Sequence, residues 1–297
     1  MSIKKHIPNL LTLANLLCGI LAIKVGFSEH YYLAGFFVIF GAVFDFFDGF
    51  AARLLKVQGE LGKQLDSLAD MVTFGVAPGV VMYSFLKYYF SELETLGDVG
   101  SIYRETVVNY DVYLPMIAFI IPLLSAVRLA KFNIDTNQSD KFIGLPTPAN
   151  AMFFVFIPLV VGINDYGWEA VQATINFELG LVVDTGKHFW DEFLNSGELA
   201  SPKKTVITYY KYVFAGLIVV FSLLLNAPIE MIALKFKTFG WKGNEIRFVF
   251  LGLSLVVILL SLLISSVFVS VPIIILLYIV LSVINNLFKK NKNELQS

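Results

Sequence analysis

The feature that most constrains this chain is the recurrence of long apolar stretches, separated by short charged segments. An apolar stretch of about eighteen or more residues crosses the roughly 30 Å hydrocarbon core of a bilayer as an α-helix, which rises about 1.5 Å per residue. Several such stretches do not fit one soluble core, and 57% of the 297 residues are hydrophobic. The sequence therefore predicts an all-α, polytopic helical membrane protein.

Eight membrane spans are expected from the apolar stretches and their polar flanks. The first resembles the apolar part of a signal peptide, but no small-x-small cleavage site follows it and further spans come after it. We therefore expect this segment to be retained as a span. The expected spans are residues 8–27, 32–54, 64–87, 112–132, 147–164, 207–226, 247–265 and 268–288.

The distribution of basic residues predicts the orientation of these spans. If the N-terminus is cytoplasmic, the inside segments carry fifteen lysines and arginines and the outside segments carry five. This bias places both termini in the cytoplasm. A long outside segment, residues 165–206, contains either an interfacial amphipathic helix near residues 187–194 or a plain solvated connector.

Composition also limits the chemistry. The lone Cys18 cannot form an internal disulfide, and His6, His30 and His188 are too scattered to suggest a zinc site. Any metal is therefore expected to have oxygen ligands. No basic patch with interleaved aromatic residues points to nucleic acid, so no nucleic-acid partner is expected.

Four aspartates stand where the second and third spans meet the cytoplasmic side. Asp45 and Asp48 share one helix face, and Asp66 and Asp70 share a face of the next helix. Counting residues at 1.5 Å each places Asp45 and Asp70 both about 12 Å from the inner boundary of the core. The two acidic stripes are therefore expected to meet at similar depth.

Carboxylates at this depth need compensation, since each buried Asp costs about 2.5 to 3.5 kcal/mol at a helix centre. A pair of divalent cations, Mg²⁺ or Mn²⁺, fits because both prefer oxygen ligands. Ion-paired aspartates that reach water are the structural alternative. A cation or proton pathway in a transporter is the functional alternative, although no inverted repeat accompanies the acids.

The acids belong to a longer pattern, D-x2-D-G-x2-A-R-x8-G-x3-D-x3-D, which the sequence matches at every fixed position between residues 45 and 70. In this pattern the chain resembles the CDP-alcohol phosphatidyltransferase family. The resemblance implies a dimeric membrane enzyme that transfers a phosphatidyl group from a CDP-linked donor to an alcohol. It also implies a six-helix core, here followed by about two extra C-terminal spans, with residues 1–164 forming the catalytic part and residues 207–297 the C-terminal helices.

The resemblance assigns roles to individual residues. It implies that Asp45, Asp48, Asp66 and Asp70 hold two metals and that Asp70 is also the general base. It further implies that Gly49, Arg53 and Gly59 lie against the CDP moiety.

Three further stretches, residues 67–79, 128–134 and 142–151, resemble the bacterial members of the family that use serine. The implied substrates are CDP-diacylglycerol and L-serine, and the implied location is the inner membrane, with the active site at its cytoplasmic face. Arg128 and Lys131 can pair with a carboxylate or phosphate, and Asn133 can hydrogen-bond the amino group. Glycerol phosphate, inositol phosphate or choline remain alternative acceptors. Asn9, Thr12 and Asn15 on the first span can face the same cavity.

Overall fold

The structure is a computed structural model that describes residues 6–28, 30–57, 59–95, 110–134, 142–160, 204–234, 240–241, 243–263 and 267–294. The expected outside insertion at residues 165–206 lies almost entirely outside the described residues. The amphipathic helix expected near residues 187–194 lies wholly outside them.

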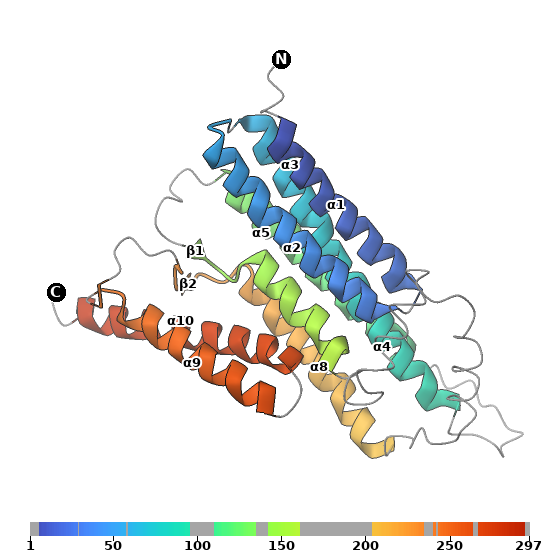
Figure 1. The fold of residues 1–297 in the computed structure, drawn as a ribbon. Helices are drawn as coiled ribbons and strands as arrows, with labels where there is room; N and C mark the ends of the chain where they lie inside the picture. The colour runs from blue at the N-terminus through green and yellow to red at the C-terminus, as the bar shows by residue number, and fades with distance from the viewer. Residues whose placement is uncertain are drawn as a thin grey trace, which may run out of the picture.

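Nearly all of the described chain is helical, which confirms the predicted all-α class (Figure 1). The C-terminal helices α9 and α10 form a hairpin that packs against the main bundle, since Phe250 and Tyr278 belong to the same buried cluster as residues of the earlier helices. The helices are α1 (His6–Phe27), α2 (Tyr31–Leu54), α3 (Glu60–Asp70), α4 (Ala77–Thr95), α5 (Ile120–Ile134), Thr147–Val160, α8 (Lys204–Leu224), α9 (Glu245–Leu263) and α10 (Ser270–Glu294).

Six of the described helical segments are long and apolar enough to cross a membrane. Two further apolar helices, Thr147–Val160 and Tyr212–Leu224, are shorter over the residues considered. These eight segments fall at the eight expected spans, so the chain is an integral membrane protein. Their exposed leucine, isoleucine and phenylalanine side chains suit contact with lipid tails.

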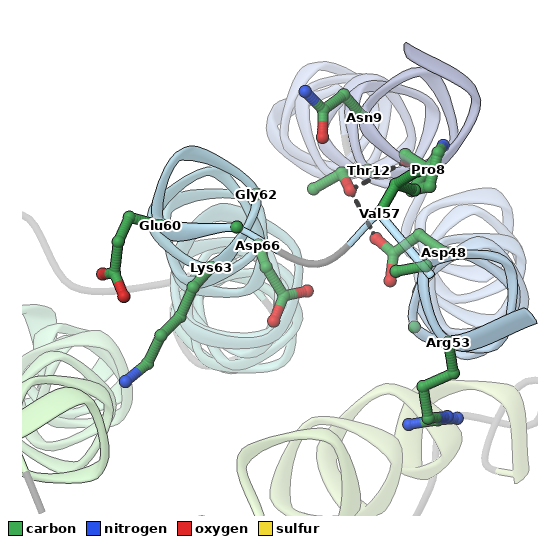
Figure 2. A pocket seen from close by; sticks show the side chains of 13 residues that line it. Pro8, Asn9, Thr12, Asp48, Arg53, Val57, Glu60, Gly62, Lys63 and Asp66 are labelled. Carbon is green, nitrogen blue, oxygen red and sulfur yellow. Dashed lines mark hydrogen bonds between the residues drawn. The ribbon is translucent and has the colours of Figure 1, made fainter. Parts of the chain in front are cut away.

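The third span is one continuous helical run whose middle differs from an α-helix. α3 begins after the extended residue Gly59 and passes into a π-helical segment, Met71–Val76, which continues as α4. Within that segment, the Thr73 hydroxyl donates to the backbone carbonyl of Asn15 at 3.0 Å. This contact fixes the run against α1, so that α1, α2 and α3 surround one polar region (Figure 2). π-Helical segments frequently occur at functional sites.

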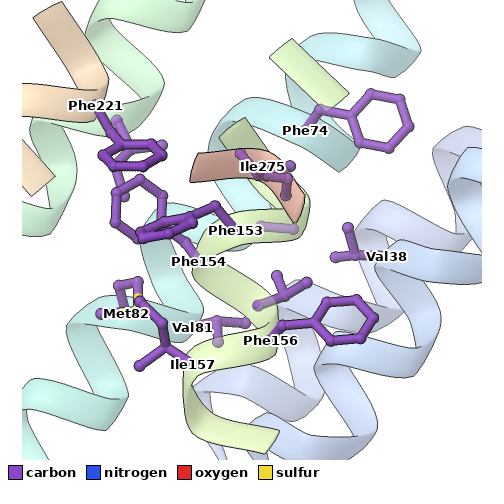
Figure 3. Packing of buried hydrophobic residues seen from close by; sticks show 14 of the residues in the cluster. Val38, Phe74, Val81, Met82, Phe153, Phe154, Phe156, Ile157, Phe221 and Ile275 are labelled. Atoms are coloured by element: carbon purple, nitrogen blue, oxygen red, sulfur yellow. The ribbon is translucent and has the colours of Figure 1, made fainter. Parts of the chain in front are cut away.

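Large aromatic side chains fill the core between the main bundle and the later helices (Figure 3). Phe153 stacks on Phe221 of α8 with ring centroids 3.8 Å apart, and Phe154 meets the same ring edge-on. Phe74 and Val81 contribute to the same buried cluster from the third span. Dispersion contacts of this kind hold membrane helices together, because lipid tails give no hydrophobic driving force between helices.

A short strand pair joins two distant parts of the chain. β1 (Phe142–Ile143) pairs antiparallel with β2 (Glu230–Met231). Next to β1, the Gly144 amide donates to the Ile229 carbonyl, and Leu145 donates to the Leu224 carbonyl at the end of α8. Gly144 has φ +77°, and a Cβ there would collide with the Leu225 carbonyl oxygen. Glycine is required at this turn for both reasons.

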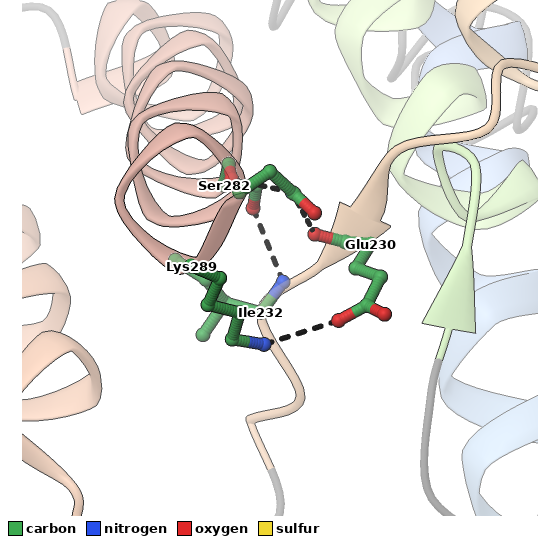
Figure 4. Close-up of polar contacts among 5 residues, drawn as sticks. Glu230, Ile232, Ser282 and Lys289 are labelled. Atoms are coloured by element: carbon green, nitrogen blue, oxygen red, sulfur yellow. Dashed lines mark hydrogen bonds and ion pairs between the residues drawn. The ribbon is translucent and has the colours of Figure 1, made fainter. Parts of the chain in front are cut away.

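One face of α10 binds the segment that contains β2 (Figure 4). Tyr278 Oη donates to the Ile232 carbonyl at 3.0 Å, and Ser282 Oγ accepts from the Ile232 amide at 3.1 Å. One and two turns further along, Asn286 donates to the Glu230 carbonyl and Lys289 pairs with the Glu230 carboxylate. The α10 side chains thereby satisfy backbone groups that an isolated two-residue strand leaves open.

Candidate active site

A cavity of about 500 Å³ opens between α1, α2 and the start of α3 (Figure 2). Helix geometry explains its polar lining, because the acids of α2 and α3 recur at steps of three and four residues and therefore share a face. The lining residues are Pro8, Asn9, Thr12, Asp48, Gly49, Ala52, Arg53, Val57, Gly59, Glu60, Gly62, Lys63 and Asp66.

Three aspartates form the acidic centre of this region. One carboxylate oxygen from each of Asp45, Asp48 and Asp66 lies within 4.8 Å of the other two. The acidic stripes of the second and third spans therefore meet, as the depth estimate indicates. Asp48 is buried, with 5% of its surface exposed, while Asp45 and Asp66 are half-buried.

The first span orients two of the carboxylates. Thr12 Oγ lies 2.6 Å from Asp48 Oδ2 and 3.1 Å from the Pro8 carbonyl oxygen. The hydroxyl has one proton, and we assign it to Asp48 because that bond is shorter and its acceptor is charged. One turn along α1, Asn15 Nδ2 donates to Asp70 Oδ1 at 3.3 Å. Asn9 lines the cavity as well. The structure thus brings all three polar residues expected on this span to the acids.

Asp70 lies deeper than the cavity lining, at the last residue of α3 before the π-helical segment. Its carboxyl group is close enough to that of Asp45 for the two groups to interact. The fourth acid is therefore next to the other three and is fixed by Asn15. In this position the Asp70 carboxyl group can contact a molecule that is bound at the other three carboxylates.

The residues expected at the donor nucleotide gather around the cavity. Gly49 follows Asp48 on α2, Arg53 is exposed one turn later, and Gly59 is the residue that precedes α3. A Cβ at Gly59 would meet nothing within 4 Å, so its surroundings are open. The cationic Arg53 and the two glycines thus border the same space as Asp48 and Asp66.

The residues expected at the acceptor do not line this cavity. Arg128 lies within the helical bundle, where its Nη1 donates to Thr147 Oγ at 3.1 Å and its charge is close enough to interact with Asp70. Asn133 lies against α3, because its Oδ1 accepts from Ser67 Oγ at 3.0 Å. Lys131 is exposed near the end of α5. Arg128 is therefore the member of this group that interacts with one of the four acids.

Sequence reasoning missed two charged residues of the cavity, Glu60 and Lys63. Lys63 Nζ also donates to the Asn133 carbonyl at 3.1 Å, which ties the end of α5 to α3. The signal was present, since Lys63 precedes Asp66 by three residues and so shares its helix face. The contact of Arg128 with Thr147 had no comparable signal, because the two residues lie on different helices.

The acidic centre fits oxygen-preferring divalent cations. Three carboxylates in mutual reach would otherwise repel one another, and Mg²⁺ and Mn²⁺ take carboxylate and water oxygens as ligands. A cavity that is bordered by these carboxylates and by cationic side chains is suited to a charged phosphate ester. The arrangement can therefore hold a diphosphate next to a further carboxyl group, that of Asp70.

Comparison with known proteins identifies the family. The model of the CDP-alcohol phosphatidyltransferases matches residues 5–183, which is more than half of the chain. The chain belongs to the CDP-alcohol phosphatidyltransferase family. The match contains the first five of the eight apolar segments described above, and two acids of the family pattern, Asp48 and Asp66, line the cavity.

Individual members of the family are similar to this chain over about half of its length. The CDP-diacylglycerol–serine O-phosphatidyltransferase of Bacillus subtilis is 34% identical over 167 residues, which are 54% of this chain and 83% of that protein. The Helicobacter pylori J99 protein of the same name is 34% identical over 155 residues, covering 52% and 57%. The archaetidylserine synthase of Methanothermobacter thermautotrophicus is 28% identical over 149 residues, covering 49% and 54%. The match therefore spans little more than half of the latter two proteins.

Proposed function

We propose that this protein transfers the phosphatidyl group of CDP-diacylglycerol to the hydroxyl group of L-serine, giving phosphatidylserine and CMP. The observation that carries the proposal is the meeting of the family's four aspartates beside a cavity lined by Gly49, Arg53 and Gly59. Membership of the family favours this activity over a cation-coupled transporter. The names of the similar proteins all include serine, although one of them concerns archaeal lipids.

In this proposal Asp45, Asp48 and Asp66 hold two divalent cations, with Asp70 as a further ligand. Bound there, Mg²⁺ or Mn²⁺ would neutralise the diphosphate and stabilise charge that develops on the transferred phosphoryl group. Thr12 keeps the Asp48 carboxylate in place through its hydrogen bond. Gly49 and Gly59 leave room for the cytidine diphosphate, and Arg53 pairs with its charge.

Asp70 removes the proton from the serine hydroxyl as that oxygen attacks. A bond forms between the hydroxyl oxygen and the phosphorus of the phosphatidyl group, and the bond from that phosphorus to the bridging oxygen breaks. CMP leaves with the bridging oxygen. The position of Asp70, beside Asp45 and held by Asn15, supports its role as the base.

Arg128 binds the carboxylate of serine in this proposal. Its guanidinium lies within electrostatic range of Asp70, so a molecule between the two can present a carboxylate to one and a hydroxyl to the other. Lys131 and Asn133 lie closer to the cytoplasmic end of α5, where they contact the acceptor on its way in.

The test of this function is incubation of the purified protein with CDP-diacylglycerol and a panel of alcohols, with and without EDTA. We expect CMP release that requires serine and a divalent cation. Release that requires glycerol phosphate, inositol phosphate or choline instead of serine would assign a different acceptor. Absence of release with every acceptor would contradict the activity.

Loss of the Thr12 hydroxyl should weaken the metal site. We expect Thr12→Val to raise the Mg²⁺ concentration for half-maximal activity about 10- to 100-fold, as is typical when a group that orients a metal ligand is lost. Thr12→Ser, which retains the hydroxyl, is the matched control and should stay near the wild-type value. A lower rate at saturating Mg²⁺ with an unchanged metal requirement would contradict this role.

We further propose that the active site and both termini face the cytoplasm of a bacterial inner membrane. The start of α1 and the turn between α2 and α3 lie at the same end of the bundle, as alternating spans require (Figure 1). In a Cys18→Ala background, cysteines at positions 95 and 196 should react with an impermeant reagent in intact spheroplasts. Cysteines at positions 58 and 293 should react only after the membrane is opened, and earlier labelling at position 58 would reverse the orientation.

The family resemblance also bears on how the chain is divided into parts and on how it assembles. We propose that residues 1–164 form the catalytic part and that the C-terminal helices are attached to it through β1 and β2. The family resemblance also favours a homodimer, which chemical crosslinking in native membranes tests. A species that remains monomeric at saturating crosslinker would contradict it.

A further inference from the structure

Among the described residues, several buried polar side-chain atoms have no hydrogen-bond partner, and two of them belong to residues that interact with Asp70. Within the described residues, buried side-chain atoms of this kind include Asn15 Oδ1, Ser125 Oγ and Arg128 Nε. Asn150 contributes two more, because neither its Nδ2 nor its Oδ1 has a partner although the residue is fully buried. Asn15 donates to Asp70, and Arg128 interacts with the charge of Asp70, so these two residues border the same place.

Helix geometry places Ser125 and Asn150 in the next layer beyond Arg128. The hydrogen bond from Arg128 to Thr147 joins the end region of α5 to the first turn of the helix Thr147–Val160, as expected for antiparallel neighbours. Ser125 precedes Arg128 by three residues, and Asn150 follows Thr147 by three. Both steps run in the same direction and cover about 4.5 Å, so the two side chains lie at similar depth.

Ser125 is also close to the third span. A Cβ placed on Gly75 of the π-helical segment would lie 3.2 Å from Ser125 Cβ. The layer is therefore bordered by the segment that directly follows Asp70.

A buried amide without partners is costly. A buried polar group without a partner loses its hydrogen bonds to water and gains none in the protein, whereas an apolar side chain of similar shape has no such loss. Asn150 carries two such groups in the interior of the bundle. Either ordered water or a bound molecule must satisfy them in the working protein.

The character of the unpaired atoms matches a particular class of molecule. Arg128 Nε and Asn150 Nδ2 are donors, which suit a carboxylate. Asn150 Oδ1 and Asn15 Oδ1 are acceptors, which suit an ammonium group. A free amino acid presents both groups together. Choline has no N–H to donate, and glycerol phosphate has no cationic group for the two acceptors.

We propose that Asn150 is a specificity-determining residue that binds the amino acid acceptor, with its Nδ2 directed to the carboxylate and its Oδ1 to the ammonium group. This inference rests on the proposed transfer to serine. In this arrangement Arg128 also binds the carboxylate of the amino acid, and Asn15 also binds its ammonium group. Ser125 lies at a similar depth to Asn150. The arrangement would leave the serine hydroxyl toward Asp70.

The test compares the serine dependence of Asn150→Leu with that of the wild-type protein. Leucine has nearly the shape of asparagine but cannot hydrogen-bond. We expect the KM for serine to rise about tenfold or more, because two hydrogen bonds of about 1 kcal/mol each are lost. The KM for CDP-diacylglycerol should stay unchanged, and the unfolding temperature without serine should not fall.

A matched pair of serine variants keeps the test decisive if Asn150→Leu fails to fold. Ser125 and Ser254 both have buried, unpaired hydroxyls, but Ser254 lies on α9, away from the acids. We expect Ser125→Ala to raise the KM for serine and Ser254→Ala to leave it unchanged.

The outcomes separate this inference from the proposed function. If wild-type protein shows no serine-dependent CMP release, the proposed function fails before any variant is compared. If wild-type protein uses serine but Asn150→Leu keeps its KM, buried water satisfies the amide and the inference is wrong. Equal rises in the KM for serine and for CDP-diacylglycerol would also overturn it, as would equal effects of Ser125→Ala and Ser254→Ala.

Discussion

Asp70→Asn should reduce turnover by roughly 10²- to 10⁴-fold, which is the range that general acid–base catalysis contributes. The amide keeps an oxygen that can face a cation, but it cannot take a proton from the serine hydroxyl at neutral pH. The binding of CDP-diacylglycerol should therefore persist in part while product formation is lost. Steady-state rates together with an equilibrium binding assay for the CDP-lipid check both halves of the expectation.

Asp45→Asn is the matched control for this result. Asp45 belongs to the group of three carboxylates within 4.8 Å of one another, whereas Asp70 lies beside that group. We expect the Asp45 variant to need more Mg²⁺ and to recover part of its rate when Mg²⁺ is raised. An Asp70→Asn protein that turned over at nearly the wild-type rate would remove Asp70 from the role of base.

Gly19→Ala should destabilise the protein by about 1 to 3 kcal/mol, the usual range for overpacking a tight core. A Cβ at Gly19 would lie 2.5 Å from Thr73 Oγ and 2.9 Å from Thr73 Cα. The second of these atoms is backbone and cannot turn aside, so α1 and the π-helical segment must separate. Thermal unfolding in detergent measures the loss.

Gly252→Ala on α9 is the control for the change of residue type. A Cβ there would meet nothing within 4 Å, and alanine favours a helix more than glycine does. We expect its unfolding temperature to equal or exceed that of the wild-type protein. Similar losses at both positions would show that close packing against Thr73 is not the cause.

Much of this fold could be predicted because membrane spans follow from local hydropathy. The eight expected spans coincide with helical segments of the structure. The π-helical segment could not be predicted in this way. It coincides with contacts between Thr73 and α1 that join residues far apart in sequence, so no local pattern encodes it.

The grouping of the four aspartates could also be predicted from the sequence, because it depends on local pattern. Asp45 and Asp48 lie on one helix, Asp66 and Asp70 lie on the next, and a short turn fixes how the two helices meet. Arg128 and Asn150 lie on separate helices whose register is set by packing and by the strand pair. The interaction of Arg128 with Asp70 and with the helix of Asn150 therefore became visible only in three dimensions.

The strand pair has a consequence for the order in which this protein is completed on the ribosome. Gly144 and Leu145 donate to the carbonyls of Ile229 and Leu224, which are translated long after the helix Thr147–Val160 has emerged. The carboxylates of α2 and α3, by contrast, come from neighbouring helices that insert in succession. A nascent chain can thus bring the carboxylates of α2 and α3 together early. The segment before the helix Thr147–Val160 gains its anchoring bonds only when α8 and β2 have left the ribosome.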